Sequence, residues 1–227
     1  MSKNFTKEEL EHDPLLDKYT KAVSYFNSNR TLILSLVVTL LVVITVFIGY
    51  NFYSSSQEEK AQNLLASAEQ FYSNGDYNKA LNGDEYTLSY GFIQISDEFS
   101  GTNAGNLATY YAAVSNFNLE NYEEALGYIL EFKHPKGIMG VGSVSFEASL
   151  YELNGSLEKA AKRYEEAANW DTNDSTTPYN LMKAANVYQE IGNSAKVEEL
   201  TKSILENYPN STEATSSKKL LGKLAVS

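Results

Sequence analysis

A long uncharged stretch near the N-terminus constrains this chain more than any other feature. No charged residue occurs at positions 31–57, and residues 32–48 are almost wholly Leu, Ile, Val and Phe. A helix over residues 31–53 would be about 34 Å long, enough to cross a hydrocarbon core of about 30 Å. Three hydroxyl-bearing residues inside it can bond back to helix carbonyls, namely Ser35, Thr39 and Thr45. We therefore predict one transmembrane helix at residues 31–53.

A cleaved signal peptide is the competing interpretation of this stretch. The apolar region of a signal peptide is shorter, about 7–15 residues, and ends in a small-residue cleavage site. Here the apolar run is longer, begins after thirty mostly polar residues and is followed by Tyr-Asn-Phe-Tyr-Ser-Ser-Ser at residues 50–56. These features favour an uncleaved anchor.

The flanking cations predict the orientation of the anchor. Lys18, Lys21 and Arg30 precede it closely, whereas Lys60 is the only near cation after it. The positive-inside rule then places residues 1–30 in the cytoplasm as a short tail. In a bacterium the anchor would lie in the inner membrane, with residues 54–60 as a joint and residues 61–227 as a periplasmic domain.

Composition excludes several classes of function. The tail carries five acids and five bases, so the net charge of −11 belongs to the domain. Such an acidic domain is unsuited to nucleic acid or to anionic lipid. The chain has no cysteine, which excludes disulfides, thiolate metal sites and thiol catalysis.

An internal repeat appears when the turns after the anchor are aligned. Four alanines each precede a turn by seven residues, and a small apolar residue follows each alanine by twelve. The pairs are Ala68 with Ala80, Ala113 with Ala125, Ala148 with Ala160, and Ala185 with Val197. Small residues at these positions allow two antiparallel helices to approach closely. The spacing therefore predicts about four helical hairpins, and residues 212–224 would form a capping helix.

The third and fourth repeats resemble tetratricopeptide repeats (TPRs). The matching small, aromatic and closing positions are Ala148, Tyr151, Gly155, Ala160, Tyr164 and Ala167, then Ala185, Tyr188, Ile204 and Pro209. The first two repeats are degenerate: Gly83-Asp84 interrupts one, and Asn116 replaces the aromatic of the other. We expect an all-α protein, with one N-terminal transmembrane helix followed by a TPR-like solenoid.

No catalytic constellation is visible. His12 and His134 would lie in different compartments, and His134 is expected to be a solvated residue of the loop at 133–137. The acid pairs Glu123-Glu124 and Glu165-Glu166 are expected on exposed helix faces. The glycine-rich segment 136–143 lacks the Gly-Lys-Ser/Thr ending of a phosphate loop and is interpreted as a connection. We expect no enzymatic activity, no cofactor and no metal.

Solenoids usually bind their partners on the concave face, which the first helix of each hairpin lines. Counting from the repeated alanines, eight positions form the candidate groove for a partner or client: Leu65, Tyr72, Tyr110, Val114, Phe117, Met182, Asn186 and Gln189. Ser145 and Ser149 also face inward. These groups suit an extended or hydrophobic polypeptide. The alternative, that the aromatic residues merely pack between helices, stays open.

The whole arrangement resembles the YfgM family, ancillary subunits of the bacterial Sec translocon. The stretches TTPYNLMKAANVYQEIG (176–192) and ENYPNSTEA (206–214) are similar to its Bacteroidota-type members. The resemblance implies a bilayer-anchored adaptor that assists exported polypeptides, with the SecYEG translocon and a membrane-anchored PpiD-like chaperone as partners. It implies no catalytic residues. The alternative is a structural TPR scaffold of another cell-envelope assembly.

The tail has an amphipathic segment at residues 19–27. Tyr19, Val23 and Phe26 would share one side, with Lys18 and Lys21 at its rim. Two interpretations stay open, a helix along the inner membrane surface and a helical run-in to the anchor, of which the second is favoured.

Overall fold

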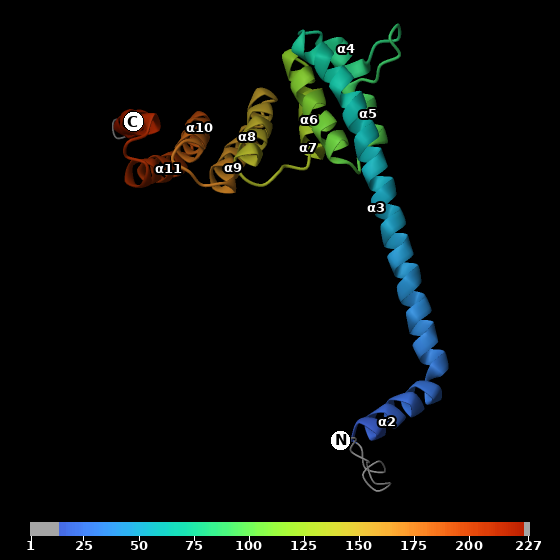
Figure 1. The fold of residues 1–227 in the computed structure, drawn as a ribbon. Coiled ribbons are helices and arrows are strands. Elements are labelled where there is room, and N and C mark those ends of the chain that lie inside the picture. The colour runs from blue at the N-terminus through green and yellow to red at the C-terminus, as the bar shows by residue number, and fades with distance from the viewer. Residues whose placement is uncertain (1–13, 225–227) are drawn as a thin grey trace, which may run out of the picture. The chain divides into compact units, whose positions relative to one another are not determined.

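The computed structural model describes residues 14–224, and these residues form a succession of helices (Figure 1). Among them the only extended pairing is a single antiparallel bridge between Asp84 and Ser89. The all-α prediction is therefore confirmed. The helices are α2 (Pro14–Ser28), α3 (Arg30–Ser73), α4 (Tyr77–Asn82), α5 (Phe92–Glu98), α6 (Asn103–Asn118), α7 (Tyr122–Glu131), α8 (Ile138–Leu153), α9 (Leu157–Trp170), α10 (Thr176–Glu190), α11 (Ser194–Asn207) and α12 (Thr212–Leu224).

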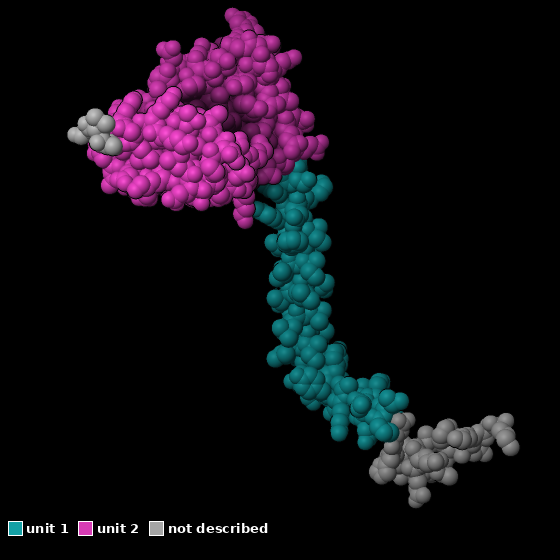
Figure 2. Space-filling view, turned by 90° about the vertical axis from the view of Figure 1, so that its left-hand side faces the viewer, with its two compact units in different colours: residues 1–56 teal, residues 57–227 magenta. Residues whose placement is uncertain are grey.

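Helix α3 contains the apolar stretch and is long and apolar enough to cross a membrane. Nearly all aliphatic side chains of the apolar stretch are exposed, and the hydroxyls of Ser35, Thr39 and Thr45 donate to backbone carbonyls 2.8–2.9 Å away, as expected. The helix continues through residues 54–60, so the expected joint is helical. The boundary between the two compact units of the chain nevertheless falls there, after Ser56 (Figure 2).

Alanine seams hold the hairpins together. Within residues 14–224 the four predicted hairpins correspond to the helix pairs α3 with α4, α6 with α7, α8 with α9, and α10 with α11. All eight residues of the repeat are fully buried, at 0% exposure: Ala68, Ala80, Ala113, Ala125, Ala148, Ala160, Ala185 and Val197. Because a larger side chain at these positions would push the helices apart, the repeat spacing follows from close helix packing.

The same hydrogen-bonded turn closes each hairpin. One residue has a positive φ, and the next residue donates its N–H to a carbonyl five residues earlier, over 2.8–3.0 Å. The positive-φ residues are Gly75, Glu120, Gly155 and Gly192, with φ between 64° and 78°. This is the Schellman ending of a helix, which favours glycine. The second hairpin uses Glu120 instead.

The first hairpin is interrupted, as the irregular repeat predicts. Helix α4 ends at Asn82, and a loop over residues 83–91 precedes α5. The loop is pinched at its base, where a Cβ on Gly83 would lie 2.1 Å from the carbonyl oxygen of Ser89. The Lys79 ammonium also donates to Asp84 over 3.0 Å. The interruption at Gly83-Asp84 is therefore a closed loop between the two short helices α4 and α5.

The cores follow one another along the chain. One cluster joins the last segment of α3 with α4, α5 and α6, a second joins α6, α7 and α8, and a third joins α8 to α12. Ala214, Ser217 and Leu220 of α12 are buried against the last hairpin, as expected of the capping helix. Each hairpin thus packs on its sequence neighbours, which is the arrangement of a repeat protein.

Candidate functional site

Three residues of the predicted groove lie along one face of α6. Tyr110, Val114 and Phe117 are all half-buried. The rings of Tyr110 and Phe117 each meet Phe146 of α8, with centroids 6.1 and 5.5 Å apart. This face of α6 therefore packs against the next hairpin, and only part of each side chain is left for a partner.

The two predicted groove residues of α3 lie deeper. Leu65 is 5% exposed and belongs to the first core cluster. Tyr72 is half-buried, and its ring contacts Tyr77, Phe92 and Tyr111 at centroid distances of 5.2–6.2 Å. These residues stabilise the first hairpin in the structure.

The remaining predicted groove residues are on α10. Met182 is half-buried, and the Ser217 hydroxyl donates to its sulfur over 3.7 Å. Asn186 and Gln189 are exposed. The predicted residues of α3 and α6 are therefore packed aromatic and aliphatic side chains, whereas on α10 the two amides, Asn186 and Gln189, are open. The role of all eight residues in binding stays a prediction.

The aromatic group is part of a larger chain of ring contacts. Rings in contact, with centroids 5.0–6.3 Å apart, run from α4 to α9 through Tyr77, Tyr72, Phe92, Tyr111, Tyr110, Phe132, His134 and Trp170. A branch leads from Tyr110 through Phe146 and Phe117 to Tyr122. Such edge and offset contacts contribute about 0.5–1.5 kcal/mol per pair beyond area burial. Aromatic rings thus connect the first three hairpins to one another, whereas alanines connect the two helices within each hairpin.

A buried ionic cluster lies at the junction between the second and third hairpins. Glu147 of α8 is 4% exposed. Its carboxylate accepts from Arg163 of α9 over 2.6 Å, and its Oε2 lies 3.0 Å from Nε2 of His134. Arg163 also pairs with Glu166. Burial of a carboxylate requires such partners, since an unpaired buried charge is very unfavourable.

His134 is not the solvated residue expected from its loop. Its side chain is 10% exposed, and its Nδ1 lies 2.9 Å from the hydroxyl of Ser143. The ring is edge-on to Phe132 and Trp170. Trp170 in turn donates its indole N–H to the carbonyl of Pro135 over 2.9 Å. The loop prediction was wrong because α8 and α9 fold over this residue.

The prediction that the glycine-rich segment 136–143 is a connection is wrong for most of its length. The connection ends at Gly137, and α8 begins at Ile138. A Cβ at Gly140 would lie 1.9 Å from the Pro135 carbonyl oxygen and 2.1 Å from the Trp170 indole nitrogen. Glycine is therefore required inside the helix, where it lets the connection pass close beside α8.

Ser143, His134 and Glu147 have the residue types of a hydrolase triad, but their placement suits a structural role. The Ser143 hydroxyl lies 3.0 Å from the carbonyl of Gly140, and the residue is 4% exposed. A nucleophile needs access to its substrate. The sequence signal that could have found this cluster is Glu147, which follows the largely apolar first half of α8.

A second set of contacts joins the third and fourth hairpins. Glu165 accepts from the Tyr188 hydroxyl over 2.6 Å and from the Lys196 ammonium over 3.1 Å. Burial and Glu165 together raise the pKa of Tyr188 to about 12. Glu165 was expected on an exposed face, but its side chain is 23% exposed because it faces α10 and α11. Glu166 is exposed, as expected.

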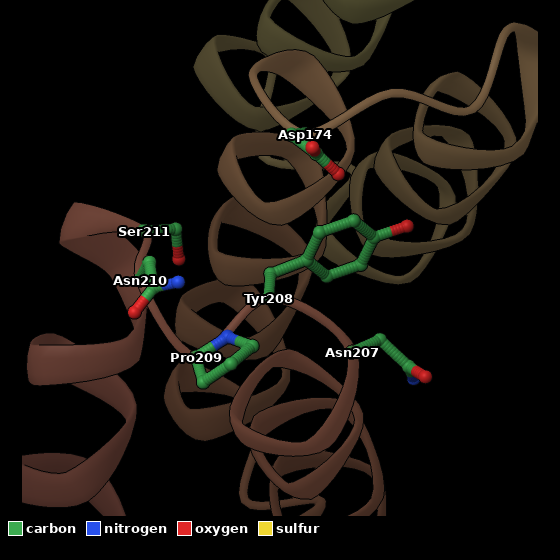
Figure 3. Close-up of a pocket in the computed structure, with 6 residues that line it drawn as sticks. All are labelled: Asp174, Asn207, Tyr208, Pro209, Asn210 and Ser211. Carbon is green, nitrogen blue, oxygen red and sulfur yellow. The ribbon is translucent and has the colours of Figure 1, made fainter.

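A small cavity lies between the loop before α10 and the loop before α12 (Figure 3). It has a volume of about 200 Å³ and is lined by Asp174, Asn207, Tyr208, Pro209, Asn210 and Ser211. Ligand pockets usually have about 300–1,000 Å³ and a mostly apolar lining. We therefore assign it no ligand. Residues 14–224 contain no group of His, Cys, Asp or Glu suited to holding a metal ion, and His12 lies outside the described residues.

No model of a known protein family matches this chain, and none of the curated proteins does.

Proposed function

We propose that this protein is a non-catalytic, membrane-anchored adaptor whose helical hairpins bind other polypeptides. The observation that carries the proposal is the continuity of α3. Its apolar part can cross a membrane, and its last part, with Ala61, Leu65 and Ala68 buried, belongs to the first hairpin. One helix thus contains both the apolar segment and part of the first hairpin. Anchoring raises the effective concentration of a binding surface near other membrane proteins.

The proposed binding surface is the first-helix face, beginning with α10. Asn186 and Gln189 are exposed there. Their amide groups offer both donors and acceptors, which suits the backbone of an extended peptide. The half-buried Tyr110 and Phe117 of α6 would add apolar contact for a hydrophobic segment.

The specific form of the proposal follows the sequence resemblance. The protein would be an ancillary subunit of the SecYEG translocon in a bacterial inner membrane, with its N-terminus in the cytoplasm and its hairpins in the periplasm. A PpiD-like chaperone would be its membrane partner, and exported polypeptides would be its clients. The acidic net charge of −11 suits unfolded chains better than nucleic acid.

The test is photocrosslinking in the native membrane, followed by mass spectrometry. One photoreactive residue replaces Asn51 in α3, and a second replaces Gln189 on α10. A third at the exposed Ala195 of α11 is the matched control on a second helix. The proposal expects a translocon subunit or the chaperone from position 51, varied exported chains from position 189, and few of these chains from position 195.

A structural scaffold of another envelope assembly is the second candidate. The ring contacts favour it, because Tyr72, Tyr110 and Phe117 already pack within the chain. A scaffold would yield one folded partner in fixed proportion from positions 51 and 189. That result would contradict the client-binding proposal.

A further inference from the structure

Helix α2 carries an apolar stripe. Leu16, Tyr19, Val23 and Phe26 follow one another at intervals of three and four residues, so they fall within about 80° of arc at about 100° per residue. Their exposed fractions are 55%, 68%, 39% and 43%. The opposite side of the helix carries Asp17, Lys21 and Ser28. Of the two cations expected at the rim of the stripe, Lys18 therefore lies nearer to it, and Lys21 lies on the far side.

Helix α2 is divided from α3 at one residue, Asn29. The side-chain amide and backbone N–H of Asn29 both donate to the Tyr25 carbonyl over 3.0 Å, and the Ile33 N–H donates to the Asn29 carbonyl over 2.9 Å. None of the residues of α2 is buried. The segment is thus helical up to a break of one residue before the anchor helix, and the apolar stripe lies on the helix that ends at Ser28.

The neighbouring anchor indicates what covers the stripe. The apolar part of α3 begins two residues after Asn29, at Thr31. A helix of 15 residues is about 22 Å long, so its whole length stays within about that distance of the point where the chain enters the membrane. A lipid surface is therefore always within reach of these four side chains.

The charges and aromatic residues of the segment fit an anionic lipid surface. Lys18, Lys21 and Arg30 outnumber the single acid Asp17 between residues 14 and 30. Cations near a membrane surface are attracted by anionic headgroups, with about 1 kcal/mol for each. Tyr19 and Tyr25 are of the type that concentrates at the membrane interface.

We infer that α2 is an interfacial helix that lies on an anionic phospholipid surface. Its apolar stripe enters the acyl region by roughly 5–10 Å, while Lys18 beside the stripe and the long side chain of Lys21 above it contact the headgroup layer. The helix gives the chain a second lipid contact beside the span. The inference rests on the membrane anchor of the proposed function.

The test uses the full chain in vesicles of phosphatidylcholine with anionic phosphatidylglycerol. Because the chain has no cysteine, single spin labels can be placed at Val23→Cys and Ser24→Cys. These neighbours lie at nearly the same distance from the span but on different sides of α2. Thr39→Cys, inside the apolar stretch, reports the span itself. Accessibility to oxygen and to a water-soluble nickel complex is measured for each label.

The expected result is that oxygen reaches the Val23→Cys label and nickel reaches the Ser24→Cys label. Replacing Lys18 and Lys21 with Gln should make the first label shallower in anionic vesicles and leave it unchanged in neutral ones. An unchanged depth in anionic vesicles would overturn the headgroup contacts.

Two other results would overturn the inference. Nickel access to both labels, with Thr39→Cys protected, would place α2 in water while the anchor stands. Spin–spin broadening at Val23→Cys without oxygen access would identify a second copy of the chain as the occupant. Nickel access at Thr39→Cys would instead remove the anchor, and with it the proposed function.

Discussion

Glu147 is a buried acidic residue that needs partners for its charge. Its carboxylate is buried and is shared by Arg163 from α9 and His134 from the preceding loop. This one side chain therefore links α8, α9 and the loop before α8. A buried pair of this kind stabilises a fold only when all of its members are present.

Replacing Glu147 with Gln should lower the free energy of unfolding by about 3 kcal/mol, because Arg163 and His134 would lose their shared anion. Urea unfolding of residues 57–227, followed by circular dichroism, measures the change. Glu166→Gln is the control, since Glu166 is exposed and its pair with Arg163 should contribute about 0–1 kcal/mol. Equal effects of the two substitutions would contradict the importance of the buried cluster.

Tyr188 should make the fold sensitive to alkaline pH. Its pKa is raised from 10.0 to about 12 by burial and by Glu165, so the folded state prefers the neutral phenol. The stabilisation is complete below pH 10 and is lost as the pH rises through about 12. The Tyr188→Phe variant should lack this part of the loss of folding stability at alkaline pH. Urea unfolding midpoints measured between pH 8 and 12 test this. Tyr179→Phe, at an exposed position, should retain the wild-type pH dependence.

The burial of single residues is what the sequence predicts least accurately. His134 stands in a loop between Lys133 and Pro135, and polar loop residues are usually solvated. Its burial depends on Glu147 and Arg163, which lie 13 and 29 positions further along the chain and reach it only after α8 and α9 have packed. No local pattern contains that information.

At the scale of the helices, the second turn differs from the other three. Glu120 has a φ of 64° where glycine stands in the other hairpins. A left-handed conformation costs a residue with a side chain about 1–2 kcal/mol. Relieving this cost should stabilise the protein.

Glu120→Gly should therefore raise the free energy of unfolding by about 0.5–1 kcal/mol, after allowance for the greater flexibility of glycine in the unfolded chain. Glu124→Gly, within helix α7, is the matched control and should lower it by about 1 kcal/mol. Thermal unfolding of both variants tests this. A loss of stability in Glu120→Gly would mean that its side chain has a structural role.

The alanine seams should not accept larger residues. Ala160 is fully buried between α8 and α9, so Ala160→Leu should overpack the seam and lower stability by about 1–3 kcal/mol. Ala195→Leu, at an exposed position of α11, should change stability by at most about 0.5 kcal/mol. An unchanged melting temperature for Ala160→Leu would contradict the hairpin packing.

At the scale of the whole molecule, α3 belongs to both compact units. The boundary after Ser56 lies inside this helix. The segment beyond it supplies Ala61, Leu65 and Ala68 to the first core cluster. In addition, the Glu58 carboxylate accepts from the backbone N–H groups of Asn103 and Ala104, at the start of α6.

A fragment of residues 57–227 should therefore fold cooperatively without the anchor. A fragment of residues 74–227 should lose the structure of the first hairpin, because Phe92 and Ile95 would be left exposed. Hydrogen exchange measured by mass spectrometry distinguishes the two. Equal protection of α4 to α6 in both fragments would mean that α3 is dispensable for the fold.

Sequence alone was enough to find the apolar helix, the four hairpins and the capping helix. The apolar run and the repeated alanines are local patterns in the sequence. The alanines act through contacts between helices that are neighbours in the chain. Hence all eight predicted seam positions are buried.

Tertiary structure alone decided how much of each predicted groove residue is exposed. Tyr110 and Phe117 lie against Phe146, whereas Asn186 and Gln189 remain open. The same helical position becomes core or surface according to the distance to the next hairpin and the size of the side chain that fills it. That distance results from the packing of the whole unit, so it is not encoded in any one repeat.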